Sequence, residues 1–270
     1  MKTLISSVVL GVLLTGSAIA ADLRMPAKAP PAMPAPAPVY NWTGCYIGGG
    51  GGYGMFDREH DMQTVAGVPV GPEIDTGGRG WFGTVQGGCD IQFGSPGGFI
   101  SIFGSSMLFG VFADGSWGSI RGTEEASNLN AFGDEKLDES WAVGARLGWL
   151  PTNSFLTFVS GGFTSAHIQD INYSNLAGVL VATLPAHSRS GWFIGTGYEY
   201  NLGWWQGLTW KTEYRWSDYG SNVDFMGGPP APVLVAFNSN THLFVQTIRS
   251  ELIWRFNWGG YSSPPVMSRY

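Results

Sequence analysis

Histidine and serine are the residue types in this sequence with the most evident catalytic use. The chain of 270 residues has four histidines, which are His60, His167, His187 and His242. A histidine beside a serine can take the hydroxyl proton and turn the oxygen into a nucleophile. His187 has such neighbours in Ser188 and Ser190, but the sequence offers no third group that would orient the imidazole. We therefore interpret these residues as part of a polar loop and predict that the protein is not an enzyme.

The spacing Gly49-x-Gly51-x-x-Gly54 matches the fingerprint of dinucleotide-binding loops. That fingerprint works where a strand turns into a helix, because the pyrophosphate of the cofactor sits at the helix N-terminus. Here the flanking residues alternate like a strand, and no helical pattern follows. We expect no cofactor, and we interpret the glycines as positions that clear space for bulky neighbours or let a strand bend.

The N-terminus predicts an exported protein. Lys2 precedes an apolar run at residues 4–14, and small residues before and at Ala20 form a cleavage site. The run is shorter than the roughly 20 residues that a transmembrane helix needs. Residues 1–20 are therefore expected to be a signal peptide that is removed near Ala20. Residues 21–40, rich in proline and alanine, are expected to form an extended periplasmic linker.

The composition is typical of a protein whose surface faces lipid. Charged residues make up 13% of the chain, about half of the usual share. Aromatic residues make up 14% and include 12 tryptophans. A membrane barrel needs an apolar outer surface and a modest polar set inside, which this composition provides. The net charge of −6, without a cluster of Lys and Arg, argues against a nucleic-acid partner.

From residue 41 onward, apolar and polar residues alternate in eight segments. These are residues 43–55, 79–93, 107–120, 139–150, 154–166, 189–203, 207–219 and 243–258. Short connections near 94–98, 151–153 and 203–206 alternate with long ones near 56–78, 121–138, 167–188 and 220–242. This is the pattern of outer-membrane barrels, with the long loops outside the cell. It predicts an all-β protein, an eight-stranded antiparallel up-and-down β-barrel over residues 41–258, followed by a tail at 259–270.

The segment at residues 207–219 shows the alternation most clearly. One face carries Leu208, Trp210, Thr212, Tyr214 and Trp216, and the other carries Lys211, Glu213, Arg215 and Ser217. A helix with this pattern would spread charge around its whole surface, so the segment predicts a strand with one polar face. A soluble β-sandwich with one wet face is the alternative. Aromatic residues near both strand ends, as at a membrane interface, favour the barrel.

Two short motifs are similar to those of a known family. Residues 41–48 (Asn-Trp-Thr-Gly-Cys-Tyr-Ile-Gly) and 83–88 (Gly-Thr-Val-Gln-Gly-Gly) resemble the first two strands of small alphaproteobacterial outer-membrane barrels. That family is often labelled porin-like and is similar to the transmembrane domain of OmpA. The resemblance covers essentially the mature chain. It implies an outer-membrane location and assembly by the barrel assembly machinery, which reads an aromatic residue near the C-terminus; Trp258 and Tyr270 are the two candidates.

Strand parity predicts which charged side chains point into the barrel. They are the acidic residues Asp90, Asp114, Glu199, Glu213 and Glu251 and the basic residues Arg146, Lys211, Arg215, Arg249 and Arg255. An eight-stranded barrel has an interior just wide enough for side chains to fill, and unpaired charges there are unfavourable. Because the acidic and basic residues are equal in number, we predict a lumen plugged by ion pairs. The alternative is a narrow, charged channel for small solutes.

The two cysteines are placed to form one disulfide. If the connection between the first two strands is symmetric about residue 67, Cys45 and Cys89 face each other across the strand pair. Opposed residues of antiparallel strands have Cα atoms about 4.5–5.5 Å apart, within reach of a disulfide. Export to an oxidising compartment permits the bond to form. We predict a cross-strand disulfide near the periplasmic rim and no metal site.

Acidic residues gather in the first two expected outer loops. They are Asp57, Glu59, Asp61, Glu73, Asp75, Glu124, Glu125, Asp134 and Glu135. Carboxylates are suitable ligands for divalent cations that bridge anionic lipopolysaccharide. Their spacing matches no defined calcium loop, however, and we interpret them as solvated loop residues.

These features predict a monomeric structural protein of the outer membrane. It would contact lipid and lipopolysaccharide, contribute to envelope integrity and display four loops. Because loops on a rigid scaffold are common binding sites, an adhesin that recognises a host surface or an extracellular ligand is a second hypothesis. A lipid A-modifying enzyme, as found among small barrels, is a further one, with His187 as its nearest candidate residue.

Overall fold

The fold is described from a computed structural model. The structure describes residues 40–64, 74–94, 106–126, 131–226 and 237–256. The expected signal peptide, the linker up to residue 39 and the C-terminal tail lie outside the described residues, as do both candidate assembly-signal aromatics.

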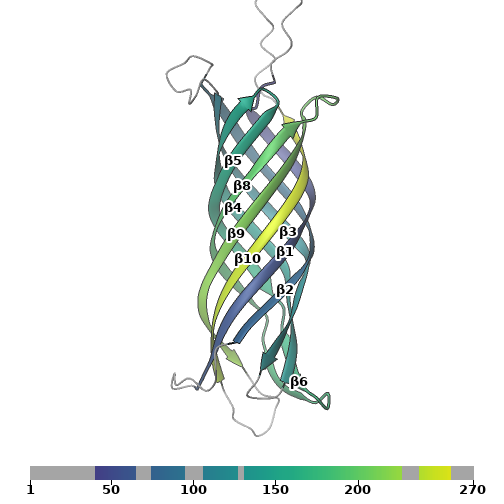
Figure 1. Ribbon diagram of the computed structural model, residues 1–270, viewed down its shortest axis with the longest axis vertical. Coiled ribbons are helices and arrows are strands. Elements are labelled where there is room, and N and C mark those ends of the chain that lie inside the picture. Colours follow the sequence, from purple (N-terminus) through teal and green to yellow (C-terminus); the bar gives the residue numbers. More distant parts are fainter. Residues whose placement is uncertain (1–39, 65–73, 95–105, 127–130, 227–236, 257–270) are drawn as a thin grey trace, which may run out of the picture. The chain divides into compact units, whose positions relative to one another are not determined.

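The described residues form ten β-strands in one antiparallel sheet (Figure 1). They are β1 (Gly44–Thr64), β2 (Ile74–Phe93), β3 (Ser106–Ala126), β4 (Ala131–Thr152), β5 (Phe155–Ile168), β6 (Ile171–Asn175), β7 (Leu180–Leu184), β8 (His187–Asn201), β9 (Leu208–Met226) and β10 (Phe237–Phe256). Within the described part of the chain, no helix has the length and apolar character needed to cross a membrane.

Eight of these strands close into a barrel. Strands β1 to β5 pair in sequence order, β5 pairs with β8, and β8, β9 and β10 follow in order. Pairing of β10 with β1 completes the ring. A closed ring leaves no strand edge with unpaired backbone groups, which is what a lipid environment requires. The predicted eight-stranded up-and-down barrel is confirmed.

The strands extend further than the sequence predicted. The long loops were expected to begin at residues 56, 121 and 220, but β1 continues to Thr64, β3 to Ala126 and β9 to Met226. A strand crosses a bilayer in about 9–11 residues, so strands of 19 to 22 residues continue well beyond it. In β1 and β3 the loop boundaries were wrong because polar residues occupy the outer face of the extensions, which removes the apolar-polar contrast. In β9 the bulge at Gly220 interrupts the alternation.

The strands β6 and β7 form a hairpin that the sequence did not predict. The hairpin lies within the expected loop 167–188, and β6 pairs with the first residues of β4. Its buried side chains join Ala131 in a small apolar cluster, to which Ile171, Tyr173, Ala182 and Leu184 contribute. We call the end of the barrel that holds this hairpin the hairpin end, and the end that holds residue 44 and residue 256 the terminal end.

The outer surface carries an apolar belt between two aromatic girdles. The hairpin-end girdle consists of Tyr53, Trp81, Trp117, Trp141, Phe163, Trp192, Trp216 and Phe244. Four pairs of neighbouring rings in it are in contact. The terminal-end girdle consists of Trp149, Phe155, Tyr198, Tyr200, Trp210, Trp254 and Phe256. Exposed aliphatic residues such as Val85, Val143 and Ile248 lie between them. Aromatic rings of this kind favour the two interfaces of a membrane.

Inward-facing glycines leave room for bulky side chains. A Cβ atom on Gly54 would lie 2.5 Å from Ile120 Cδ1, and one on Gly52 would collide with the Phe82 ring. The dinucleotide-like spacing from Gly49 to Gly54 lies within β1, whose backbone pairs with β2 on one side and β10 on the other. The glycines therefore serve packing in a strand rather than an open phosphate-binding loop.

We expect the substitution Gly54→Leu to destabilise the barrel by about 1–3 kcal/mol, because it overpacks the interior against Ile120. Gly83→Leu is the matched control, since Gly83 is exposed and a Cβ atom there would lie 3.9 Å from its nearest neighbours. Urea unfolding in phospholipid vesicles, read from the gel mobility of unheated samples, gives the two midpoints. Equal midpoints would contradict this packing role.

Candidate functional site

The ten charged residues assigned to the lumen by strand parity are all buried, with exposed fractions between 0% and 7%. The structure groups them into three layers along the barrel. We call these the terminal layer, the middle layer and the third layer, counted from the terminal end.

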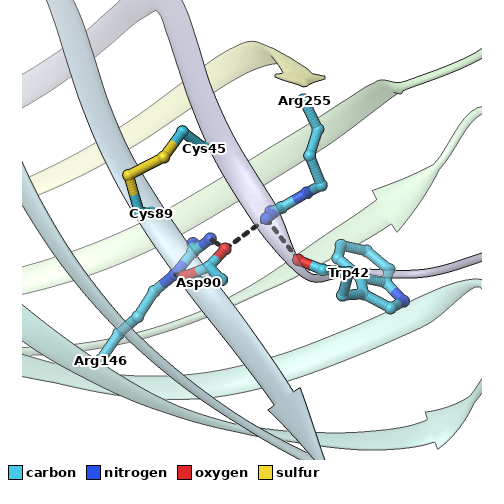
Figure 2. The surroundings of a disulfide bond; sticks show 6 residues. All are labelled: Trp42, Cys45, Cys89, Asp90, Arg146 and Arg255. Atoms are coloured by element: carbon cyan, nitrogen blue, oxygen red, sulfur yellow. Dashed lines mark hydrogen bonds and ion pairs between the residues drawn. A yellow bond between two sulfur atoms is a disulfide. The ribbon is translucent and has the colours of Figure 1, made fainter. Parts of the chain in front are cut away.

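The terminal layer joins two carboxylates to two guanidinium groups, those of Asp90, Glu199, Arg146 and Arg255. Figure 2 shows Asp90 between Arg146 and Arg255. Arg146 donates to Asp90 through Nε at 2.9 Å and Nη2 at 2.5 Å, and to Glu199 through Nη1 at 3.1 Å. Arg255 donates to Asp90 through Nη1, and to Glu199 through Nη2 at 3.1 Å. Each carboxylate thus faces two guanidinium groups, and charge-assisted hydrogen bonds of this kind are among the strongest in proteins.

Trp42 lies across the terminal end of this layer and is fully buried. Its carbonyl oxygen accepts a hydrogen bond of 2.8 Å from Arg255, which also stacks over its ring at 5.3 Å (Figure 2). Its backbone N–H donates to Gln92 Oε1 at 3.0 Å, and its indole N–H donates to the Asn153 carbonyl at 3.1 Å. The segment that precedes β1 is therefore fixed to β2, to β10 and to the turn between β4 and β5.

A disulfide joins β1 and β2 next to the terminal layer (Figure 2). Cys45 lies opposite Cys89 in the strand register, with a Cα–Cα distance of 3.9 Å. Asp90 follows Cys89 in the chain, and Tyr46, which follows Cys45, places its ring 4.7 Å from the Arg146 guanidinium. The covalent link therefore fixes the two strands that carry an acid and an aromatic ring of this layer.

The middle layer is centred on Lys211. Its ammonium lies 2.9 Å from Glu213, 3.4 Å from Glu251 and 2.9 Å from the amide oxygen of Gln86. Gln86 donates in turn to Glu251 at 2.6 Å, and the Ser160 hydroxyl donates to Glu213 at 2.7 Å. The sequence analysis missed Gln86 and Ser160, because neutral polar residues of inward parity gave no charge signal.

The third layer places Asp114 between two arginines. Arg249 donates to Asp114 Oδ1 at 2.8 Å, and Arg215 donates to both oxygens at 3.2 and 3.0 Å. Arg215 also contacts Glu213 at 3.3 Å, which connects the third layer to the middle layer. Every one of the ten predicted charges thus has an oppositely charged partner within the lumen.

An apolar cluster fills the barrel on the hairpin-end side of the third layer. It consists of Phe56, Phe82, Ile120, Leu137, Ala166, Ile168, Tyr219, Leu243 and Val245, which come from seven of the eight barrel strands. A cavity of about 40 Å³ separates the cluster from Asp114, Arg215 and Arg249. That volume has room for a few water molecules at most.

A further charged group lies nearer the hairpin end. Arg58 forms buried ion pairs with Glu124 at 3.2 Å and Glu135 at 3.1 Å. Our prediction that Glu124 and Glu135 are solvated loop residues was wrong, because β3 and β4 extend past them and turn their side chains inward. Burial, and then the neighbouring Glu124 carboxylate, raise the pKa of the Tyr173 phenol well above its usual value, so this hairpin residue stays protonated.

Five of the other acidic residues of the two expected loops are exposed, as predicted for solvated residues. Asp57, Glu59, Asp75, Glu125 and Asp134 are exposed on the outer face. Asp61 lies in β1 and Glu73 outside the described residues, and the side chains of neither are described. Across the described residues, no group of three His, Cys, Asp or Glu side chains is placed to hold a metal ion.

His187, the catalytic candidate, contacts neighbours other than serine. Its Nδ1 lies 3.1 Å from the Pro185 carbonyl, and Arg189 donates to its Nε2 at 3.4 Å. Ser188 and Ser190 are exposed and form no hydrogen bond with His187 in the described part of the chain. The structure therefore does not bring these three residues together as a catalytic set.

His167 and Asp138 form a pair on the hairpin-end side of the hairpin-end girdle. His167 Nδ1 lies 2.8 Å from Asp138, and Gln169 donates to the same carboxylate at 2.7 Å. Burial opposes ionisation of Asp138, but the hydrogen bonds from His167 and Gln169 outweigh it and hold the pKa of the carboxyl below its usual range. His60 lies in β1, and its side chain is not among those described.

His242 lies between an aspartate and a serine, an arrangement that the sequence analysis missed. Its Nε2 is 2.9 Å from Asp218 and its Nδ1 is 3.2 Å from the Ser221 hydroxyl. A β-bulge in β9 brings both residues to one face, since Gly220 has a φ of 65° and its N–H donates to Asp218 at 2.8 Å. Because Asp218 also closes this turn, the contacts give the three residues a role in holding the bulge.

No family model matches this chain. It is 29% identical over 220 residues to the 31 kDa outer-membrane immunogenic protein of Brucella melitensis and equally similar to that of Brucella suis, with 76% of this chain and 82% of each relative covered. Among solved structures, the outer membrane protein OprG from Pseudomonas aeruginosa matches with a TM-score of 0.50 and 13% identity, over 82% of this chain and 100% of OprG. The chain is a small outer-membrane β-barrel protein.

In this outer-membrane barrel, the aromatic girdles and the apolar belt between them face lipid, and the paired charges face inward. The two faces of each strand therefore meet opposite solvents, and the period-2 alternation of the sequence records that difference.

We expect Asp90→Asn to destabilise the barrel by about 3–5 kcal/mol, because it leaves Arg146 and Arg255 with one buried carboxylate instead of two. Asp57→Asn, at an exposed position, is the matched control and should change stability by no more than about 0.5 kcal/mol. Urea titration in vesicles, followed by tryptophan fluorescence, measures both. A loss for Asp90→Asn no larger than that of the control would show that the terminal layer is solvated.

We expect removal of the disulfide by Cys45→Ser with Cys89→Ser to lower the free energy of unfolding by about 2–4 kcal/mol, since the bond restricts the unfolded chain. The reduced wild-type protein should show the same loss, which controls for the serines. Alkylation under non-reducing denaturation should label no cysteine of the mature protein. Uptake of two alkyl groups would contradict the bond.

Proposed function

We propose that this barrel is a structural, non-enzymatic protein of the outer membrane whose lumen is closed by side chains. The single observation that carries the proposal is the continuous stack inside the barrel. From the terminal end it runs through Trp42, three ion-paired layers, the apolar cluster and the ion pairs of Arg58. A solute that crossed this stack would have to separate buried ion pairs and then pass an apolar layer, and both steps are strongly unfavourable.

The structure offers little support for a channel. The lumen charges are engaged with one another, and the cavity next to the third layer has a volume of only about 40 Å³. An ion-conducting pore needs a continuous wet path, as in larger barrels, and a ring of charges of one sign is one way to make it selective for ions. The described buried charges balance, with seven acidic and seven basic side chains, so the lumen has no net charge for ion selection.

The proposal places the terminal end in the periplasm and the hairpin end outside the cell. Short turns connect β4 to β5 and β8 to β9 at the terminal end, and the long strand extensions lie at the other end. Small outer-membrane barrels have short periplasmic turns and longer extracellular connections. The charged layers and the disulfide then stabilise the periplasmic half, and the extensions carry the loops away from the lipid surface.

Recognition of an extracellular partner is a second candidate function, and the hairpin of β6 and β7 favours it. Apolar side chains are exposed at its tip, with Leu176 at 87% and Val179 at 58%. Patches of exposed apolar residues are common at protein-binding sites. The Brucella relatives are named immunogenic outer-membrane proteins, which is consistent with display of such a segment.

The test of closure is conductance. The purified wild-type protein, shown to be folded by its faster gel migration before heating, should give no steady current in a planar bilayer. Because the layers act in series, Trp42→Ala and Phe82→Ala should each remain silent as well. A large porin inserted in the same membranes provides the positive control. Regular conductance steps from the wild-type monomer would overturn the proposal.

A further inference from the structure

Three basic residues form a row on the outer surface of the barrel. The strand register places Arg79 of β2 opposite Arg121 of β3, and Arg121 opposite Lys136 of β4. Arg79 and Arg121 are exposed and Lys136 is partly exposed. Neighbouring strands lie about 4.7–4.9 Å apart, so the backbone positions of the three residues lie within about 10 Å of one another.

The row contains every outward-facing basic residue of the described ranges. Seven of the basic residues in the described ranges are buried inside the barrel: Arg58, Arg146, Arg189, Lys211, Arg215, Arg249 and Arg255. The other three basic residues of those ranges are the members of this row. All outward-facing positive charge in the described part of the chain is therefore gathered on three adjacent strands.

The chain itself does little to neutralise the row. Like charges directly opposite each other in a sheet are destabilising. Among the described residues, the hydrogen bond from Arg121 Nε to Ser119 Oγ, at 2.6 Å, is the one polar side-chain contact of the three, and they form no ion pair. The nearest outer-face acids along β4 are Asp134, which accepts a hydrogen bond from Thr123, Asp138, which is engaged with His167 and Gln169, and Glu139. Basic side chains that repel one another and form no ion pair with the described residues are suited to bind an external anion.

The row lies at the depth where lipid headgroups begin. Each member is on the hairpin-end side of a girdle tryptophan of its own strand: Arg79 is two residues from Trp81, Arg121 four from Trp117, and Lys136 five from Trp141. Tryptophan girdles mark the boundary of the hydrocarbon. The row therefore starts at that boundary and extends away from the hydrocarbon.

We propose that Arg79, Arg121 and Lys136 bind the phosphate groups of a phosphorylated glycolipid, of the lipopolysaccharide type, in the outer leaflet. Guanidinium groups suit this ligand because they form paired hydrogen bonds with phosphate oxygens. The inference rests on the proposed orientation, in which the hairpin end lies outside the cell. The phosphates would relieve the repulsion within the row and hold a lipid against β2, β3 and β4.

Binding of lipid A tests the proposal directly. The folded full-length mature protein in detergent is titrated with bis-phosphorylated lipid A and, separately, with lipid A from which both phosphates have been removed. The wild type should prefer the phosphorylated form by at least tenfold. The variant R79Q/R121Q/K136Q should lose this preference, and R79K/R121K, which keeps the charges, should retain most of it. The variant D57N/D134N, which removes two acids that flank the row, should keep or strengthen the preference, because it makes the surface around the row more positive.

Thermal unfolding provides a second readout that a structural role alone would not produce. Without lipid A, Arg121→Gln should raise the melting temperature, because it removes like-charge repulsion with its two neighbours. Bis-phosphorylated lipid A should raise the melting temperature of the wild type more than that of the variant. The difference between the two melting temperatures should therefore shrink or reverse. This single substitution also serves if the triple variant does not fold.

Three results would overturn the proposal: no preference of the wild type for phosphorylated lipid A, an equal preference in R79Q/R121Q/K136Q, or displacement of lipid A by a sulfated oligosaccharide at equal concentration. The last would indicate a site for an extracellular glycan instead. Closure of the lumen is read from conductance and does not involve these side chains. Exposure of the hairpin to added protease on intact cells tests the orientation separately, so failure of this proposal is distinguishable from failure of the proposed function.

Discussion

The lumen of this barrel excludes bulk water, so each charge inside it needs a partner within the protein. That constraint accounts for the equal numbers of buried acidic and basic residues and for the shared contacts, in which Asp90 faces both Arg146 and Arg255. It also accounts for the residues around the layers. Trp42 covers the terminal layer, glycines clear space for the rings, and a disulfide fixes the first two strands beside them.

The environment outside the barrel imposes a complementary constraint. Between the girdles the outer face must be apolar, and beyond the hairpin-end girdle it can be polar again. Charge is therefore placed by depth. The basic residues of the described ranges are either buried in the lumen or gathered in the row of Arg79, Arg121 and Lys136. Exposed acids such as Asp57 and Asp134 lie further toward the hairpin end. The barrel thus has an interior without net charge and an outer surface whose polarity and charge change with depth in the membrane.

Alternation of residue type predicted the barrel and its strand count, because the two faces of a membrane strand meet different solvents. It also named the ten lumen charges, since parity is fixed once a strand is placed. It failed where the contrast disappears: the outer face of β1 past residue 56 is polar, so the strand extension and the inward turn of Arg58 were missed. The bulge that brings Ser221 beside His242 depends on Gly220 and on pairing with β10, which a single segment does not reveal.

The central claim is that the lumen charges are partners of one another and are not solvated. A double-mutant cycle on Asp114 and Arg249, joined at 2.8 Å, tests it most directly. The free energy of unfolding in vesicles is measured for the wild type, Asp114→Asn, Arg249→Met and the double variant. Buried partners should show a coupling of about 1.5 kcal/mol or more, with the double variant more stable than the sum of the single losses predicts. Additivity within about 0.5 kcal/mol, as for solvent-screened pairs, would contradict the account.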